Sequence, residues 1–218
     1  MNMKKLLTLA LAAAMTLSLA ACGGDSGKAP AGSNGGGTVS TSGSQTGGDA
    51  SGLPEIEAGS CSTPAVLTSV GQSADVEIVG TLCSKAGIEV TIDNDIKADE
   101  LSADCKTLLL AVGGSSKGLG AAGIDADGEL ARTDELLKKA DELGITVVAL
   151  HTGGSARRGT LSDSFISPAF AAADIAVVVA EGDGDGLMSG ILAGNSTPSA
   201  YVEQVADCIA TLKTLFGV

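Results

Sequence analysis

From about Pro64 onward, compact blocks of hydrophobic residues alternate with longer segments in which apolar residues recur every third or fourth position. The compact blocks are typical of buried strands, and the spaced positions are typical of helices that bury one face. The blocks predict five strands, at 65–70, 88–92, 107–112, 145–150 and 175–179. The spacing predicts helices after the first strand, at 127–143, at 187–193 and near the end, where one face carries Val202, Val205, Ala206, Ile209, Leu212 and Phe216.

This alternation predicts one α/β domain over residues 61–218. Each helix that connects two parallel strands packs back on the sheet with a right-handed crossover, so helices cover both faces. The expected fold is therefore a doubly wound, mostly parallel five-stranded sheet. A flavodoxin-like strand order, 2-1-3-4-5, is the first expectation, and a Rossmann-like order is the alternative.

The N-terminal segment has the pattern of an export signal. Lys4 and Lys5 precede an uncharged stretch that ends in Leu-Ala-Ala-Cys at 19–22. This run resembles the bacterial lipobox, which implies that residues 1–21 are a lipoprotein signal peptide and that Cys22 carries the lipid. The implied location is the bacterial cell envelope, outside the cytoplasm, with the lipid bilayer as a partner of acylated Cys22. A plain secretory signal with a chance cysteine is the alternative.

Residues 22–60 are expected to form a flexible tether behind the lipidated cysteine. Most of this segment is rich in Gly and Ser, a composition that buries too little apolar surface to offset the loss of chain entropy on folding.

Composition and charge exclude several functions. The 218 residues include 13 Lys and Arg against 26 Asp and Glu, which gives a formal net charge of -13. This charge opposes binding to a phosphate backbone, and an aromatic content of 2% offers few surfaces on which bases could stack. Nucleic acid is therefore not an expected partner. With one histidine and no CxxC spacing, neither a zinc site nor any other cofactor is expected.

Four cysteines follow the lipobox cysteine. Cys61 and Cys105 each lie just before a predicted strand, so a disulfide between them is sterically reasonable if those strands are neighbours. Cys83 and Cys208 fall on apolar faces of predicted helices, where they are expected to be small buried residues.

The loops after the first, third, fourth and fifth strands are the candidate site, because ligands of doubly wound sheets bind beyond the carboxyl ends of the strands. These loops combine glycines, hydroxyl groups and three cations on an acidic domain, which favours a small anionic metabolite with a carboxylate or phosphate. The alternative is that the glycine turns only close tight connections, with the two arginines solvated or salt-bridged to Glu181 or Asp183. The candidate residues are Ser69, Gly71, Gln72, Ser73, Gly113, Gly114, Ser115, Ser116, Lys117, Gly118, His151, Gly153, Gly154, Arg157, Arg158, Ser162 and Asp163.

Three longer runs carry a family resemblance. They are PAVLTSVGQSADV at 64–76, LAVGGSSKGLGAAGID at 110–125 and ALHTGGSARRGTLSD at 149–163. The runs resemble an uncharacterised bacterial family of exported proteins, known as a domain of unknown function, and the resemblance covers about residues 61–218. It implies one α/β domain outside the cytoplasm and assigns no catalytic residue.

Two sharper motifs are weaker candidates. Ser116 lies in a G-x-S-x-G run and could form a triad with His151 and Asp163, but many residues separate this run from the next predicted helix and the triad order differs from that of α/β hydrolases. The acidic loop at 181–186 resembles the first half of a calcium loop, yet its twelfth position would be Leu192 instead of a bidentate carboxylate. Nucleotide-binding glycine fingerprints are not met.

We therefore expect a membrane-anchored binding module for a small anionic solute, acting as accessory to a membrane transporter or sensor. An extracytoplasmic hydrolase that uses Ser116 and His151 is the rival hypothesis. A structural lipoprotein that binds a partner is the third.

Overall fold

The computed structural model describes residues 52–218. The predicted signal peptide at 1–21, Cys22 and the tether up to residue 51 lie outside the described residues. Among residues 52–218, no helix has the length and hydrophobicity needed to cross a membrane.

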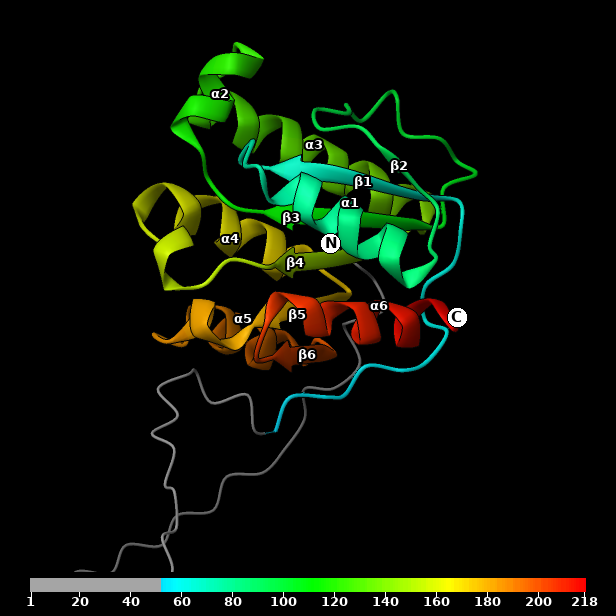
Figure 1. Cartoon of the computed structure of the whole chain (residues 1–218). Coiled ribbons are helices and arrows are strands. Elements are labelled where there is room, and N and C mark those ends of the chain that lie inside the picture. The colour runs from blue at the N-terminus through cyan, green and yellow to red at the C-terminus, as the bar shows by residue number, and fades with distance from the viewer. Residues whose placement is uncertain (1–51) are drawn as a thin grey trace, which may run out of the picture. The chain divides into compact units, whose positions relative to one another are not determined.

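The domain is built on one parallel sheet with the strand order β2-β1-β3-β4-β5-β6 (Figure 1). Its strands are β1 (Ala65–Val70), β2 (Val90–Ile92), β3 (Thr107–Val112), β4 (Thr146–His151), β5 (Ile175–Val179) and β6 (Ser199–Val202). The neighbours β1 and β3 pair over their full lengths, from Ala65 opposite Thr107 to Val70 opposite Val112. Their carboxyl ends therefore stop side by side.

The sheet has six strands, so the expectation of five was wrong. The five predicted strands follow the expected 2-1-3-4-5 order, and β6 adds to the outer side of β5. The sequence of β6, Ser-Ala-Tyr-Val, is short and all four residues are half-buried. Neither an apolar block nor a clear alternation therefore marked it.

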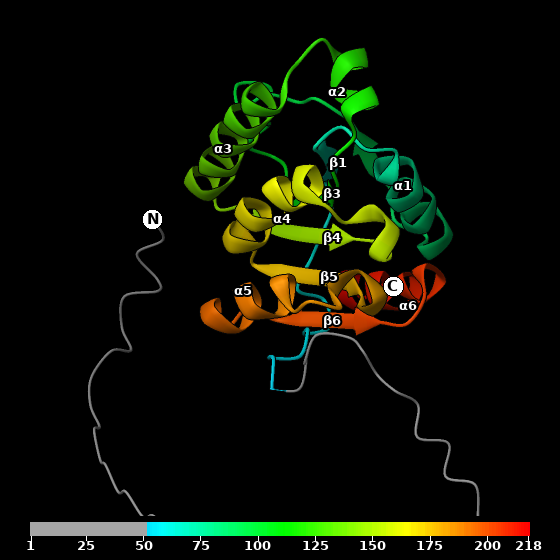
Figure 2. The ribbon, with the colours of Figure 1, turned by 90° about the vertical axis from the view of Figure 1, so that its left-hand side faces the viewer.

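Helices cover both faces of the sheet (Figure 2). Helices α1 (Asp75–Ala86) and α6 (Cys208–Phe216) pack together on one face, where their apolar residues join those of alternate strand positions. Helices α3 (Ala126–Leu143), α4 (Thr160–Ala172) and α5 (Leu187–Asn195) cover the other face. A short helix, α2 (Ser116–Ala122), follows β3. The described residues also include three single helical turns, at Ser155–Arg157, Ala180–Asp183 and Val205–Asp207.

Helices α2 and α4 were missing from the sequence prediction. Two glycines in α2 lower its helix propensity by about 1 kcal/mol each, and the helix forms where Ser115 caps it by accepting a hydrogen bond from Gly118 N. Helix α4 contains Pro168, which usually interrupts a helix. Burial of α4 residues against the sheet outweighs the effect of this proline, because most helical stability in proteins comes from packing.

The last helix also begins later than predicted. Val202 belongs to β6, and Val205 and Ala206 lie in a single turn before α6 starts at Cys208. The helix-like spacing of apolar residues includes the end of β6, because β6 and α6 bury residues in the same core.

The folded domain begins before residue 61, inside the segment assigned to the tether. Pro54 O accepts a hydrogen bond from Ser199 N, and Gly59 N donates to Thr214 O. Leu53 and Ile56 pack against the two cores. The described end of the predicted tether is therefore held to the domain by backbone pairing and apolar contact.

All four cysteines among the described residues are buried and free. The disulfide considered between Cys61 and Cys105 is not formed, and the Cys105 thiol instead lies 3.3 Å from Thr107 O. Cys83 and Cys208 are buried in one core, as expected of small apolar residues. Burial raises the pKa of each of these two thiols to about 11, which keeps them protonated and unreactive at neutral pH.

Candidate functional site

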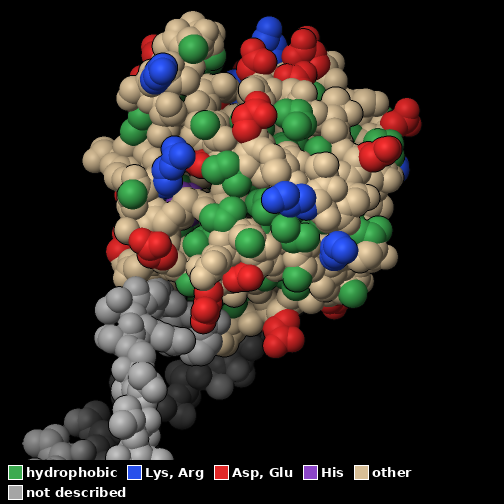
Figure 3. All heavy atoms as spheres, viewed as in Figure 1, with side chains coloured by type: hydrophobic (Ala, Val, Ile, Leu, Met, Phe, Trp, Pro, Cys, Tyr) green, Lys and Arg blue, Asp and Glu red, His purple; other side chains and the backbone are tan. Residues whose placement is uncertain are grey.

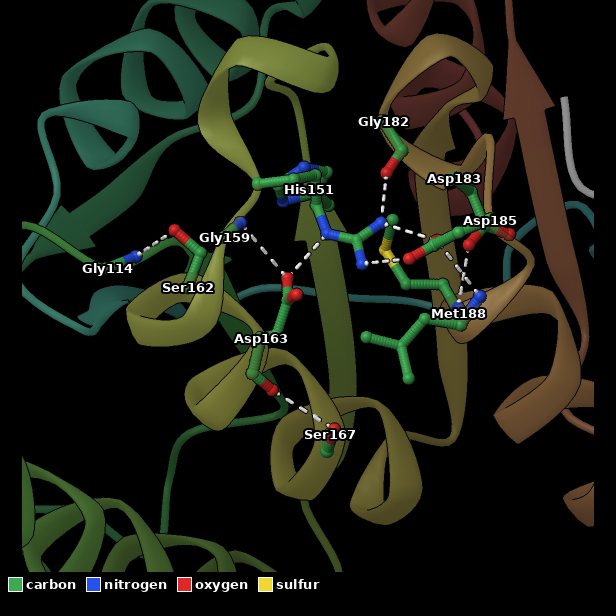
Figure 4. Close-up of polar contacts among 12 residues, drawn as sticks. Gly114, His151, Gly159, Ser162, Asp163, Ser167, Gly182, Asp183, Asp185 and Met188 are labelled. Atoms are coloured by element: carbon green, nitrogen blue, oxygen red, sulfur yellow. Dashed lines mark hydrogen bonds and ion pairs between the residues drawn. The ribbon is translucent and has the colours of Figure 1, made fainter. Parts of the chain in front are cut away.

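The four loops singled out from the sequence meet at the carboxyl edge of the sheet. The turn after β1 joins the turn after β3 through a hydrogen bond from Ser115 N to Gly71 O. The turn after β3 reaches α4 through a bond of 3.1 Å from Gly114 N to Ser162 Oγ (Figure 4). The loop after β4 joins that after β5 through Ser155 Oγ and Glu181 Oε1, 3.0 Å apart.

A pocket of about 340 Å³ opens between these loops. It lies where the chain leaves β1 toward one face of the sheet and leaves β3 toward the other, which is the usual binding position in doubly wound folds. Its lining residues are Asp75, Gly113, Gly114, Ala156, Arg157, Arg158, Gly159, Thr160, Leu161 and Ser162.

The N-terminus of α4 forms one wall of the pocket. The helix begins at Thr160, and Gly159 precedes it with a φ of 139°, a backbone conformation that favours glycine. No side chain caps this end. The first amides of a helix lack partners within the helix and carry its positive partial charge, so this wall favours an anion.

Arg157 is the cation most available to a ligand. Its side chain is 49% exposed and forms a loose ion pair, with Nη2 3.8 Å from Asp75 Oδ1. The stem of this side chain packs over Gly153, because a Cβ at that glycine would overlap it. Arg157 therefore lies along the pocket with its guanidinium open to further contacts.

Five lining residues were missing from the candidates, namely Asp75, Ala156, Gly159, Thr160 and Leu161, and Asp75 is the charged one among them. It is 1% exposed, and its Oδ2 accepts a hydrogen bond of 2.8 Å from Ser73 Oγ. Its Oδ1 has no hydrogen-bond partner among the residues that the structure describes. In a sequence, an acidic residue in the first turn of a helix looks like an ordinary residue that compensates the helix dipole. No other pattern marked Asp75 as a site residue.

Arg158, by contrast, is committed to the fold. Its guanidinium donates to Asp163, to the Gly182 carbonyl and, through two bonds of 3.0 Å, to Asp185; these three partners surround it in Figure 4. Burial opposes its charge, but the hydrogen bonds to Asp163 and Asp185 outweigh that effect and raise the pKa of Arg158. The same contact lowers the pKa of Asp185. The alternative of a salt-bridged arginine therefore holds for Arg158, with partners other than the expected Glu181 and Asp183.

The acidic loop after β5 has structural contacts for each of its carboxylates. Asp183 is fully buried and accepts hydrogen bonds from Met188 N, Ser189 N and Tyr201 Oη. Glu181 binds Ser155. Within residues 52–218, no three His, Cys, Asp or Glu side chains are arranged to hold a metal ion. Each carboxylate of this loop is therefore engaged in contacts within the fold.

Several predicted residues lie outside the pocket lining. Gln72 has a φ of 54° and directs its side chain to Glu129 and to Asn94 O, while Gly71 N donates to the same glutamate. Ser69 binds Ser73. Gly154 lies near Glu181, and Asp163 binds Arg158. These residues shape the loops around the pocket.

Lys117 also lies outside the pocket lining. Ser116 and Lys117 are exposed residues of α2. Gly118 sits against the Gln72 carbonyl, where any Cβ would overlap it. The turn after β3 therefore brings Gly113 and Gly114 to the pocket. The residues that follow, from Ser116 to Gly118, continue into α2 and lie outside the pocket lining.

The only histidine of the chain is buried beneath the site. His151 is fully buried, and its Nδ1 lies 3.0 Å from Val112 O, which assigns the ring proton to Nδ1. Its Nε2 has no hydrogen-bond partner in the described domain and faces Gly182. Ser116, His151 and Asp163 share no hydrogen bonds in the described residues, so they do not form a hydrolase triad in this structure.

The buried ring predicts a pH dependence of stability. Burial lowers the pKa of His151 below its ordinary 6.5, although the Val112 hydrogen bond and the charge of Asp75 act in the opposite direction. The unfolded chain therefore binds a proton at a higher pH than the folded chain does. The stabilisation is complete above about pH 6.5 and is lost as the pH falls below that value.

Urea unfolding between pH 7.5 and 5.5 should show this loss as a falling midpoint. His151→Gln should give a flatter profile over the same range, because it removes the titrating ring. Parallel profiles for both proteins would contradict the assignment.

On the face shown in Figure 3, the Lys and Arg side chains are separate from one another and do not gather into one basic patch. This face therefore offers no continuous basic surface of the kind that polyanions bind.

Together the fold and the pocket define an α/β domain with a concave site at the switch point of a parallel sheet. The chain belongs to the family described as domain of unknown function DUF6305, whose model matches residues 62–216. No curated protein was found to match the chain. The expected relationship to a domain of unknown function is confirmed, whereas the bacterial and exported character that it implies stays a prediction.

Proposed function

We propose that the domain binds a small molecule through its anionic group, in the pocket between Gly113–Gly114 and the start of α4. The observation that carries this proposal is the uncapped N-terminus of α4, which lines the same pocket as the half-exposed guanidinium of Arg157. Backbone amides at a helix start and a planar arginine fork are the groups that bind carboxylates and phosphates in proteins. The volume of about 340 Å³ suits a metabolite.

Two variants test whether anions stabilise the protein by binding in the pocket or through its overall charge. Phosphate, acetate and succinate are expected to raise the melting temperature of the protein, and Arg157→Ala should abolish most of that rise. Lys117→Ala removes the same charge from α2, outside the pocket lining, and should leave the rise intact.

The measurement is thermal unfolding at rising ligand concentration, because a ligand that binds only the folded state stabilises it according to its concentration and Kd. Equal losses in the two variants would show that the effect is not specific to the pocket. No stabilisation by any of the anions would overturn the proposed function.

We further propose that the protein is an exported lipoprotein of the bacterial cell envelope, with Cys22 as its anchor and the following segment as its tether. In this arrangement the domain would hold its solute next to the membrane, where a transporter or sensor could receive it. The support is the lipobox-like run at 19–22 behind a positive, apolar leader.

Cys22→Ser tests the anchor. In a bacterial host, the unchanged chain is expected in the membrane fraction with an acylated N-terminal peptide. The variant should lose the acylation and leave that fraction, because two or three acyl chains are what would hold the protein on the bilayer. Cell fractionation and mass spectrometry provide the measurement. A variant that stays with the membrane would contradict the lipid anchor.

A further inference from the structure

The structure points to a second feature of the ligand, an inference that rests on the proposed function. We propose that the ligand carries a protonated amine close to its anionic group, and that Asp75 binds this amine. The pocket would thus recognise small zwitterions, such as amino acids or aminophosphonates.

The first argument is the incomplete pairing of Asp75. The side chain is almost fully buried, yet only one of its two carboxylate oxygens has a hydrogen bond. The nearest cation, Arg157, lies 3.8 Å from the other oxygen, which is beyond hydrogen-bond distance. A buried carboxylate is costly unless it is paired and hydrogen-bonded, so this oxygen is suited to a further donor with positive charge.

The second argument is the spacing of charge along the pocket. A Cβ at Gly113 would lie 2.7 Å from Asp75 Oδ2, and a Cβ at Gly114 would lie 2.8 Å from Ser162 N at the start of α4. The negative carboxylate and the positive helix start therefore flank two consecutive residues, whose Cα atoms are about 3.8 Å apart. A ligand that meets both therefore carries its amine only a few bonds from its anionic group.

The third argument is the balance of charges. Arg158 is already paired with Asp163 and Asp185, so Arg157 and Asp75 are the pocket-lining charges with capacity for new partners. When an anionic group engages Arg157, the loose pair between Arg157 and Asp75 weakens. An ammonium group on the same ligand replaces Arg157 beside Asp75, and each buried charge keeps a partner of opposite sign.

Matched probes that share a carbon skeleton test this inference. One series is propionate, lactate and alanine, and a second is succinate, malate and aspartate; in both, only the substituent at carbon 2 changes from hydrogen to hydroxyl to ammonium. Ethylphosphonate and 2-aminoethylphosphonate form the corresponding phosphonate pair. Titration calorimetry on the full chain is expected to show at least tenfold tighter binding of the amine than of the unsubstituted member in one series, with the hydroxyl compound between them.

Asp75→Asn should remove this preference while leaving the unsubstituted anion bound, because the amide keeps the shape of the side chain and loses its charge. Glu77→Gln is the matched control, since it makes the same charge change on an exposed residue of the same helix. Circular dichroism checks that each variant is folded. If Asp75→Asn does not fold, the ratio of affinities for the amine and the unsubstituted probe, measured on the unaltered protein, decides whether the pocket prefers the amine.

The possible outcomes separate the two proposals. Anions that bind equally well with and without the amine would overturn the zwitterion and leave the proposed function standing. If no probe binds, both proposals fail. A preference for the amine that survives in Asp75→Asn would overturn the role of Asp75.

Discussion

Glu129→Ala is expected to destabilise the domain by about 3–5 kcal/mol, because it breaks a buried ion pair from one side. Glu129 is fully buried on α3, and Arg132, one helical turn later, binds both of its oxygens at 2.8 Å. Without the carboxylate, a buried guanidinium loses its counter-charge. A loss of this size is a large share of the roughly 5–15 kcal/mol that holds a typical domain folded.

The same pair fastens the loops that carry the site. Glu129 accepts from Gly71 N at 2.9 Å and from the Gln72 side chain, and Arg132 donates to Ser69 O and Ile96 O. The loss of Glu129 therefore also frees the turn after β1, which leads directly to Asp75. We expect the variant to bind anions more weakly even where it remains folded.

Urea unfolding provides the measurement, and two further variants interpret it. Asp134→Ala breaks an exposed pair with Lys138 on the same helix and should change stability little, because solvent screens such pairs. Glu129→Leu combined with Arg132→Met removes both charges and should recover only the part of the loss that comes from the unpaired guanidinium, because Gly71 N, Ser69 O and Ile96 O still lose their partners. A Glu129→Ala midpoint equal to that of Asp134→Ala would refute the account.

Gly71→Ala is expected to cost about 3 kcal/mol or more, for two reasons that add. The φ of Gly71 is 95°, a conformation that strains any other residue by about 1–2 kcal/mol. A Cβ there would also overlap the Gly113 carbonyl oxygen and lie 2.7 Å from the buried ring of Phe165. Overpacking of this kind costs about 1–3 kcal/mol, since neither the backbone of β3 nor a core aromatic ring moves easily.

Gly87→Ala separates the two contributions. Gly87 has a similar φ of 80° at the end of α1, but a Cβ there would meet nothing within 4 Å. It should therefore show the conformational cost alone, about 1–2 kcal/mol. The thermal and urea midpoints of the two variants provide the comparison. Equal losses would show that the close approach of the β1 and β3 turns is unimportant for stability.

The sequence located the site better than it identified the residues in it. The convergence of four loops followed from parallel strands alone, and the pocket does lie there. Lys117 was expected beside Arg157, yet α2 carries it outside the pocket lining. Gly118 lies so close to the Gln72 carbonyl that the path of α2 depends on this tertiary contact.

Arg157 and Arg158 illustrate why the rest was beyond sequence reasoning. They are adjacent and chemically identical, yet one is half-exposed over the pocket and the other is bound to Asp185, 27 residues further along the chain. Asp75 appeared to be a routine acidic residue at a helix start. Its Oδ2 lies against Gly113 and accepts from Ser73, which belong to two different turns.

Local patterns in this chain determined five strands, the α/β class and the edge of the sheet where a ligand would be held. The reason is that each strand or helix must bury its own apolar face, so its hydrophobic periodicity is visible in its own sequence. Tertiary structure alone decided the sixth strand, the start of the domain near Leu53 and the division of charged side chains between fold and pocket. Those outcomes depend on which distant groups meet when the loops close, and the free energy of a charge is set by its partners and its burial rather than by its neighbours in sequence.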